Sequence, residues 1–186
     1  MPNISLPIGI DDFQKLREND FYYVDKTGII KELLDKRAEV NLFTRPRCFG
    51  KSLNLSMLRY FFELPADAKN NTPLFEGLEV MSAGEKYIKE QGQYPVIALS
   101  LKAAKQPDFD MAYASLVDDI RREFDRHNEV LRSENISKAD KEKFIRIRDW
   151  KADRIDYAKS LCADRDSFSI EGISDKIKPG SRKRKV

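Results

Sequence analysis

Residues 41–52 place the strongest constraint on the fold of this chain, and they read Asn-Leu-Phe-Thr-Arg-Pro-Arg-Cys-Phe-Gly-Lys-Ser. The apolar run from Val40 to Phe43 predicts a buried strand, and a turn rich in Arg and Pro follows it. Gly-Lys-Ser then opens a run, residues 53–62, that predicts a largely buried helix. A strand, a tight loop, Gly-Lys-Ser and a helix in this order are typical of a phosphate-binding P-loop.

The chemistry of such a loop assigns a role to each residue type. Backbone N–H groups at a helix N-terminus bind anions, and a glycine lets the backbone approach a phosphate closely. A lysine can reach the β- and γ-phosphates, and a serine hydroxyl can ligate Mg²⁺. We therefore expect ATP and Mg²⁺ as cofactors, with Ser52 as the metal ligand. The expected binding residues are Arg45, Pro46, Arg47, Cys48, Phe49, Gly50, Lys51, Ser52 and Leu53.

The match to the P-loop pattern is incomplete. The full pattern has a glycine five residues before Gly50, and this chain has Arg45 there. Gly-Lys-Ser/Thr also arises by chance in roughly one chain in ten of this length, given average residue usage. The alternative is a helix start with an ordinary solvated lysine, but the flanking strand and helix favour the P-loop.

Several motifs together resemble the N-terminal part of the AAA-ATPase-like family, whose members often carry a nuclease-like domain further on. The resemblance covers about residues 4–162. An Arg commonly stands at the position of Arg45 in that family, whereas Cys48 replaces a usual basic residue and weakens the positive rim of the loop. The motifs, in the family's order, are Leu6-Pro7-Ile8-Gly9, Tyr23-Val24-Asp25-Lys26-Thr27, Phe43-Thr44-Arg45-Pro46-Arg47, Phe49-Gly50-Lys51-Ser52-Leu53 and Leu74-Phe75-Glu76-Gly77-Leu78.

The resemblance implies an α/β fold of the P-loop NTPase type, with three layers, many helices and an incomplete sheet. Residues 95–101 are nearly all apolar and predict a second buried strand. In AAA-type folds this strand and the strand at 39–44 are not neighbours, so the chain reads as the first part of a domain. A truncated gene, a frameshifted product and a genuine short variant would each account for this. Apolar strand edges without partners predict self-association or pairing with a protein partner.

Helical periodicity predicts the remaining elements. Asp25 reads as the N-cap of a helix over 26–37. The resemblance implies that the N-terminal arm before this helix packs beside the nucleotide. Ser137 matches a capping box. Further helices are expected over 111–128, from 138 onward and over 153–162. Leu74 to Leu78 predict an apolar plug against the core.

The hydrolytic half of an ATPase is not visible. Hydrolysis needs a carboxylate at the end of a neighbouring strand to hold Mg²⁺. Asp11 and Asp12 follow a run broken by Gly9, and Asp118-Asp119 lie within a helical period and predict an exposed acidic patch. We name no catalytic residue, and whether the chain is an enzyme stays open. The alternative is an interaction module or a truncated fragment that no longer binds nucleotide.

Composition bounds the partners and the compartment. No apolar run approaches the roughly 20 residues of a membrane span, and the first residues, Met-Pro-Asn-Ile-Ser, lack the basic start and apolar core of a signal peptide. Two cysteines without metal or disulfide spacing favour a cytoplasmic setting. The single His127 lacks a companion ligand and is expected to be solvated. Net charge is +3, and residues 164–186 supply it with seven Lys/Arg against four Asp/Glu. Residues 1–162 form the expected domain, and 163–186 form an unrelated flexible basic tail. Nucleic-acid binding, or nuclear targeting through Arg182 to Lys185, is expected only from that tail.

Overall fold

The computed structural model describes residues 5–38, 40–44, 46, 49–64, 70–102, 104–132 and 136–160. Of these residues 56% are helical and 1% are in β structure, and they contain no sheet. The prediction of a three-layer α/β fold is therefore wrong. The basic tail at 163–186 and its proposed roles lie outside the described residues.

The two predicted strands show why the α/β prediction fails. Val40 and Leu42 are both 84% exposed, and Leu101 is 65% exposed, so these apolar runs are not covered on both faces. The β structure of the described residues is an isolated parallel bridge between Glu63 and Tyr94. An apolar run becomes a strand only when a neighbouring strand takes its backbone hydrogen bonds.

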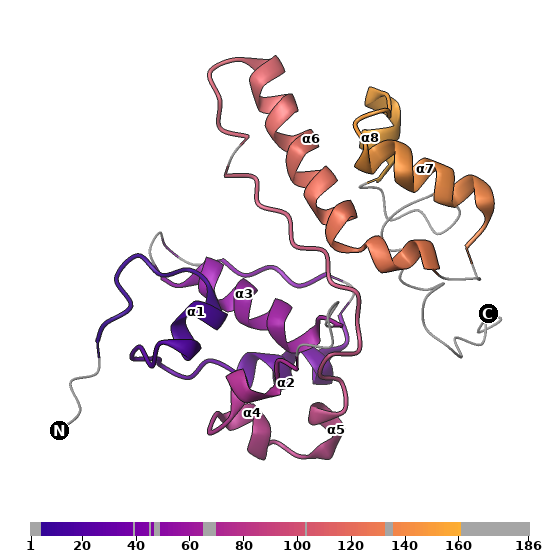
Figure 1. The fold of residues 1–186 in the computed structure, drawn as a ribbon. Coiled ribbons are helices and arrows are strands. Elements are labelled where there is room, and N and C mark those ends of the chain that lie inside the picture. Colours follow the sequence, from indigo (N-terminus) through magenta and orange to yellow (C-terminus); the bar gives the residue numbers. More distant parts are fainter. Residues whose placement is uncertain are drawn as a thin grey trace. The chain divides into compact units, whose positions relative to one another are not determined.

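The chain divides into two compact units, Met1–Val96 and Ile97–Val186. In the first unit, the described residues form α1 (Phe13–Glu18), α2 (Gly28–Lys36), α3 (Lys51–Phe62), the 3₁₀ helix η1 (Thr72–Phe75), α4 (Glu79–Ser82) and α5 (Glu85–Ile88), of which Figure 1 labels the α-helices. The second contains α6 (Phe109–Arg126), the 3₁₀ helix η2 (Asn128–Arg132), α7 (Lys138–Arg148) and α8 (Arg154–Ser160).

Three phenylalanines form the centre of the first unit. Phe13 of α1, Phe61 of α3 and Phe75 of η1 are fully buried. The Phe75 ring lies 5.1 Å from that of Phe13 and 5.3 Å from that of Phe61, between centroids. The predicted plug at Leu74 to Leu78 is thereby confirmed for Leu74 and Phe75, which are both buried. These contacts fix α3, the helix that begins with Lys51, against α1 and η1.

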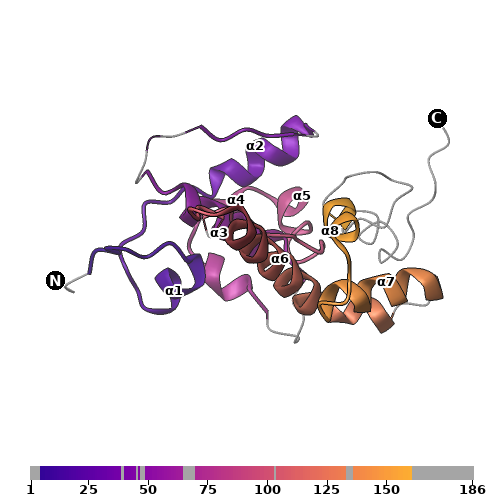
Figure 2. The ribbon, with the colours of Figure 1, turned by 90° about the horizontal axis from the view of Figure 1, so that it is seen from above.

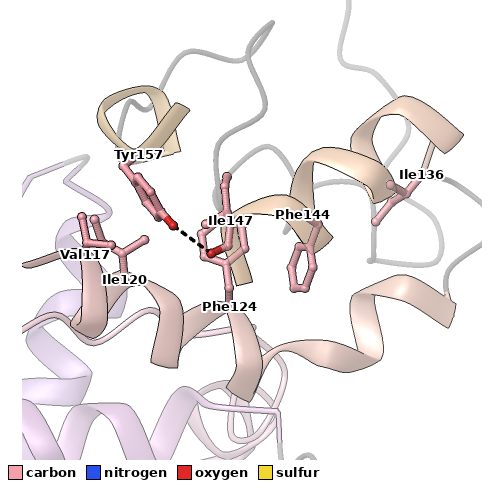
Figure 3. Packing of buried hydrophobic residues seen from close by; sticks show 7 residues of the cluster. All are labelled: Val117, Ile120, Phe124, Ile136, Phe144, Ile147 and Tyr157. Atoms are coloured by element: carbon pink, nitrogen blue, oxygen red, sulfur yellow. Dashed lines mark hydrogen bonds between the residues drawn. The ribbon is translucent and has the colours of Figure 1, made fainter. Parts of the chain in front are cut away.

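The second unit has a separate core between its helices. Figure 3 shows Phe124 and Ile147 between α6 and α7, while the Tyr157 hydroxyl of α8 donates to the carbonyl of Ile147 at 3.3 Å. Both views of the ribbon place α8 beside α7 (Figures 1 and 2). The buried members of this core are Val117, Ile120, Phe124, Ile136, Phe144, Ile147 and Tyr157.

The predicted second strand instead begins this unit as a segment that lies on α6. Ile97 and Leu99 pack against the core, and the Ala98 N–H donates to the Glu123 carboxylate at 3.0 Å. Alternate side chains thus face a helix, and a side-chain carboxylate takes the backbone hydrogen bond that a neighbouring strand would accept. The prediction of a strand covered on both faces is therefore wrong for this segment.

Local predictions for the second unit were mixed. The helix expected over 111–128 is α6, and the Ser137 hydroxyl accepts the Asp140 N–H at 3.1 Å at the start of α7, as a capping box requires. His127 was predicted to be solvated, which is wrong. It is 5% exposed, and its Nδ1 lies 2.8 Å from the Glu123 carbonyl oxygen.

The acidic pair in α6 is less exposed than predicted. Asp118 and Asp119 are partly buried, and both carboxylates form ion pairs with Arg122. Asp118 also pairs with Arg121. Because these contacts lie within one helix at spacings of three and four residues, the pair stabilises α6 locally.

Candidate nucleotide-binding site

The start of α3 has the backbone geometry that a P-loop glycine provides. Gly50 is the N-cap residue, with φ of 70° in the left-handed region, and no side chain caps the helix. Its carbonyl accepts the Asn54 N–H at 2.9 Å. A Cβ at this position would meet open space, so glycine is favoured by its φ and not by crowding. The first N–H groups of α3 therefore have no side-chain cap.

Lys51 is the first residue of α3, and its side chain lies on the preceding loop. Its Nζ donates to the carbonyl oxygen of Pro46 at 3.1 Å, and the Phe49 N–H donates to the same oxygen at 3.4 Å. Lys51 is exposed, as is Phe49. The ammonium group is thus held beside the N-terminus of α3, where a bound anion would also lie.

Ser52 and Leu53 complete the first turn of α3. Ser52 is partly buried, and Leu53 packs against the core of the first unit. A cavity of about 40 Å³ opens beside this turn, with space for water and not for a nucleotide base. Its lining residues are Ile29, Phe43, Lys51, Asn54, Leu55 and Leu58.

Three residues of the predicted cradle, Arg45, Arg47 and Cys48, lie outside the described residues. Their roles stay predictions. Of the other members, Phe49 and Lys51 both donate to the Pro46 carbonyl, and Gly50, Lys51, Ser52 and Leu53 follow one another at the start of α3.

The donor set at this turn suits a metal that arrives with a nucleotide. No group of three or more His, Cys, Asp or Glu residues that could hold a metal occurs in the described part of the chain. Mg²⁺ is commonly bound through one or two protein ligands together with phosphate oxygens and water. The Ser52 hydroxyl, partly buried in the first turn of α3, fits that arrangement.

Asp12 has a structural role, whereas the sequence offers it only as a poor candidate for the Mg²⁺ carboxylate. Its Oδ1 accepts the Lys15 N–H at 2.8 Å, and its Oδ2 accepts the Tyr60 hydroxyl at 3.1 Å. The first contact makes Asp12 the N-cap of α1, a role that an Asp directly before an apolar helical run can predict. The second links α1 to α3.

Asp25 caps a helix other than the one predicted. Its carboxylate accepts the N–H and hydroxyl of Thr27, at 2.8 and 2.7 Å, and the N–H of Glu79 at 2.7 Å. The N-cap position of α2 belongs to Thr27, so the prediction that Asp25 occupies it is wrong. Thr27 itself accepts the Val80 N–H at 3.1 Å. Asp25 and Thr27 thus hold the first turn of α4, which follows them by more than 50 residues.

The pKa of Asp25 reflects this bonding. Burial by itself raises the pKa of the carboxyl, but hydrogen bonds from Glu79 and Thr27 favour the ionised form and leave the pKa below its ordinary value. Whether the arm also packs beside a nucleotide, as the resemblance implies, stays a prediction.

Comparison with known proteins identifies the class of this chain. A family model described as predicted AAA-ATPase matches residues 7–165. The chain belongs to the AAA-ATPase-like family, which confirms the resemblance carried by the sequence motifs.

The chain is also similar to an uncharacterized protein in the vnfD 5′ region of Azotobacter chroococcum mcd 1. It is 47% identical over 81 residues, which cover 43% of this chain and 14% of the relative. This chain thus matches only a small part of that relative's length. No solved structure matches. Among the described helices, none is both long enough and apolar enough to cross a membrane.

Proposed function

We propose that this chain binds Mg-ATP at the N-terminus of α3, through the loop and turn from Arg45 to Leu53. The observation that carries the proposal is the pairing of Gly50, a left-handed N-cap, with Lys51 as the first helical residue. This places a lysine ammonium next to backbone donors that no side chain caps. Membership of the AAA-ATPase-like family supports the same reading.

Different groups in the first turn of α3 would bind the phosphates and the Mg²⁺ ion. The N–H groups of the turn and the helix dipole favour a phosphate oxygen in front of the helix. Lys51, now donating to the Pro46 carbonyl, would neutralise the β- and γ-phosphates. Ser52 would supply one hydroxyl ligand to Mg²⁺, whose own chemistry is to neutralise phosphate charge.

Hydrolysis is not part of the proposal. Asp12 accepts hydrogen bonds at both carboxylate oxygens, and Asp118 and Asp119 are ion-paired within α6. These three carboxylates are therefore committed to structural contacts. If the part of the chain that the structure describes offers no other carboxylate to hold Mg²⁺ from the other side, binding would hold the triphosphate without orienting water.

Titration calorimetry with Mg-ATP tests the proposal. The wild-type chain should bind weakly, and Lys51→Ala should abolish binding, because it removes the side-chain cation at the helix start. Lys36→Ala is a matched control, since Lys36 is also exposed in the first unit and pairs only weakly with Glu32 at 3.4 Å. Equal heats from the wild type and Lys51→Ala would refute the proposal.

A non-catalytic interaction module is the second candidate. Several large apolar side chains near α3 are exposed, and exposed apolar groups of this kind often mark partner surfaces. They are Val40, Leu42, Phe49 and Leu55. Absence of any ATP binding by the wild type would favour this candidate over the first.

A further inference from the structure

A polar network joins the first turn of α1 to the middle of α3. The Phe13 N–H, at the start of α1, donates to the Ser56 hydroxyl of α3 at 3.0 Å. The Phe13 ring is fully buried and lies against Tyr23 and Phe75. Because this residue has both its backbone and its ring fixed, the start of α1 cannot shift relative to α3 without breaking these contacts.

Asp12 is the centre of this network. Its Oδ2 accepts from the Tyr60 hydroxyl at 3.1 Å and lies 3.4 Å from the Ser56 hydroxyl, while its Oδ1 caps α1 through Lys15. A single carboxylate therefore takes donors from two helices, and its partners in α3 lie 44 and 48 residues further along the chain. Charged acceptors of this kind form stronger hydrogen bonds than neutral ones.

The network lies on the helical face that also carries the metal-ligating serine of the proposed site. Ser52, Ser56 and Tyr60 are spaced four residues apart in α3, so their side chains form one row, with neighbouring Cβ atoms about 6 Å apart. Asp12 contacts the second and third members of the row. Its contacts therefore begin one helical turn after Ser52.

We infer that Asp12 is a positioning residue for the phosphate site: through Ser56 and Tyr60 it fixes the orientation of α3, and with it the turn that holds Lys51 and Ser52. This inference rests on the proposed function. Anion binding at a helix N-terminus depends on the direction in which the N–H groups point, and supporting contacts that hold such groups contribute to affinity without touching the ligand.

The experiment measures the affinity for Mg-ATP by calorimetry, well below the melting transition, for three variants of the full chain. Asp12→Asn keeps the size of the side chain but removes its charge, and it replaces one of the two carboxylate oxygens with an NH₂ group, which is a donor. It should raise the Kd roughly tenfold, the lower end of the cost of losing an outer-shell partner. Tyr60→Phe removes one hydroxyl and should raise the Kd roughly threefold, the effect of one ordinary hydrogen bond.

Asp35→Asn is the matched control. Asp35 also accepts two side-chain donors within the first unit, from Lys86 at 2.7 Å and Tyr87 at 3.0 Å, but it belongs to α2. Its replacement should leave the Kd unchanged. A carboxylate that only stabilises the fold would lower the melting temperature and leave the Kd of the folded protein unaltered, so the Kd separates positioning from stability.

The outcomes are distinct. An unchanged Kd in both Asp12→Asn and Tyr60→Phe would overturn the inference, as would an equal rise in Asp35→Asn. If Asp12→Asn does not fold, Tyr60→Phe decides by itself. Binding lost only in Lys51→Ala would keep the proposed function and overturn the positioning role, whereas no binding by the wild type would overturn both.

Discussion

At the scale of single residues, carboxylates hold the first unit together. Asp12 joins α1 to α3, and Asp25 joins the segment before α2 to the first turn of α4. Arg17 of α1 also joins two elements, but as a donor: its guanidinium donates to the carbonyls of Leu74 and Glu76, at 2.8 Å each. In each case a charged side chain satisfies backbone or hydroxyl groups that short elements leave without partners.

Asp25→Asn should destabilise the chain by about 1–3 kcal/mol at neutral pH, because an amide places a donor opposite an N–H group. The folded pKa of Asp25 lies below its ordinary value. Its carboxylate therefore contributes fully above about pH 4, and the contribution is lost as the pH falls through the lower folded pKa. Urea unfolding of wild type and variant between neutral and acidic pH should show the difference in stability shrinking below about pH 4. A constant difference would contradict this.

At the scale of elements, the two units use different means to stabilise helices. α4 and α5 are four residues each and too short to be stable alone, so α4 depends on caps from Asp25 and Thr27. α6 and α7 have their own N-caps, Asp108 and Ser137, and amphipathic faces that meet in one core. Helices with local caps, such as α6 and α7, are therefore predictable from sequence, whereas α4, which distant residues cap, is not.

Ser137→Ala should lower the stability of the second unit by about 1 kcal/mol, the usual cost of losing an N-cap. The Ser137 hydroxyl accepts the Asp140 N–H, and alanine leaves that donor to water. Hydrogen exchange of α7 amides should report the loss. Ser137→Asp retains an acceptor and should restore most of the protection, and protection unaltered by alanine would show that the cap does not matter.

At the scale of the whole molecule, exposed apolar side chains are the notable feature. Val40 and Leu42 are almost fully exposed, and they belong to the segment that leads to the proposed phosphate-binding loop. Such groups favour contact with another protein surface. The sequence predicts self-association through unpaired strand edges. Because residues 40–44 form no strand, the exposed Val40 and Leu42 side chains are the basis on which self-association is expected.

The chain should therefore self-associate, and the double variant Val40→Lys, Leu42→Lys should reduce association by adding charge to that segment. Light scattering after size-exclusion chromatography, over a range of concentrations, measures the effect. A monomer at every concentration for the wild type would exclude this role for residues 40–42.

ATP hydrolysis by the purified chain should be little or none, because we identify no carboxylate among the described residues that would hold Mg²⁺ opposite the proposed ligand Ser52. Phosphate release measured with saturating Mg-ATP tests this directly. Turnover that disappears in Lys51→Ala would show that such a carboxylate is present in the chain. Turnover that persists in Lys51→Ala would indicate a contaminating enzyme.

Features that depend on residues close together in the sequence can be predicted from the sequence alone. The spacing of Val117, Ile120 and Phe124 predicted α6, the order Ser-Lys-Ala-Asp predicted the cap at Ser137, and Gly50-Lys51-Ser52 predicted the start of α3. The motifs also predicted the family. Each of these signals lies within one or two helical turns, where backbone geometry links residues three and four apart.

Contacts between residues far apart in the sequence are visible only in the tertiary structure. The apolar runs at 40–43 and 97–101 have the composition of strands, but no sheet forms among the described residues, because a strand needs a partner that its own sequence does not specify. Asp12 meets Tyr60 across 48 residues, and Asp25 meets Glu79 across 54. His127 is buried by the packing of the second unit. Contacts of this kind depend on how whole elements pack, and a local pattern carries no record of the partner.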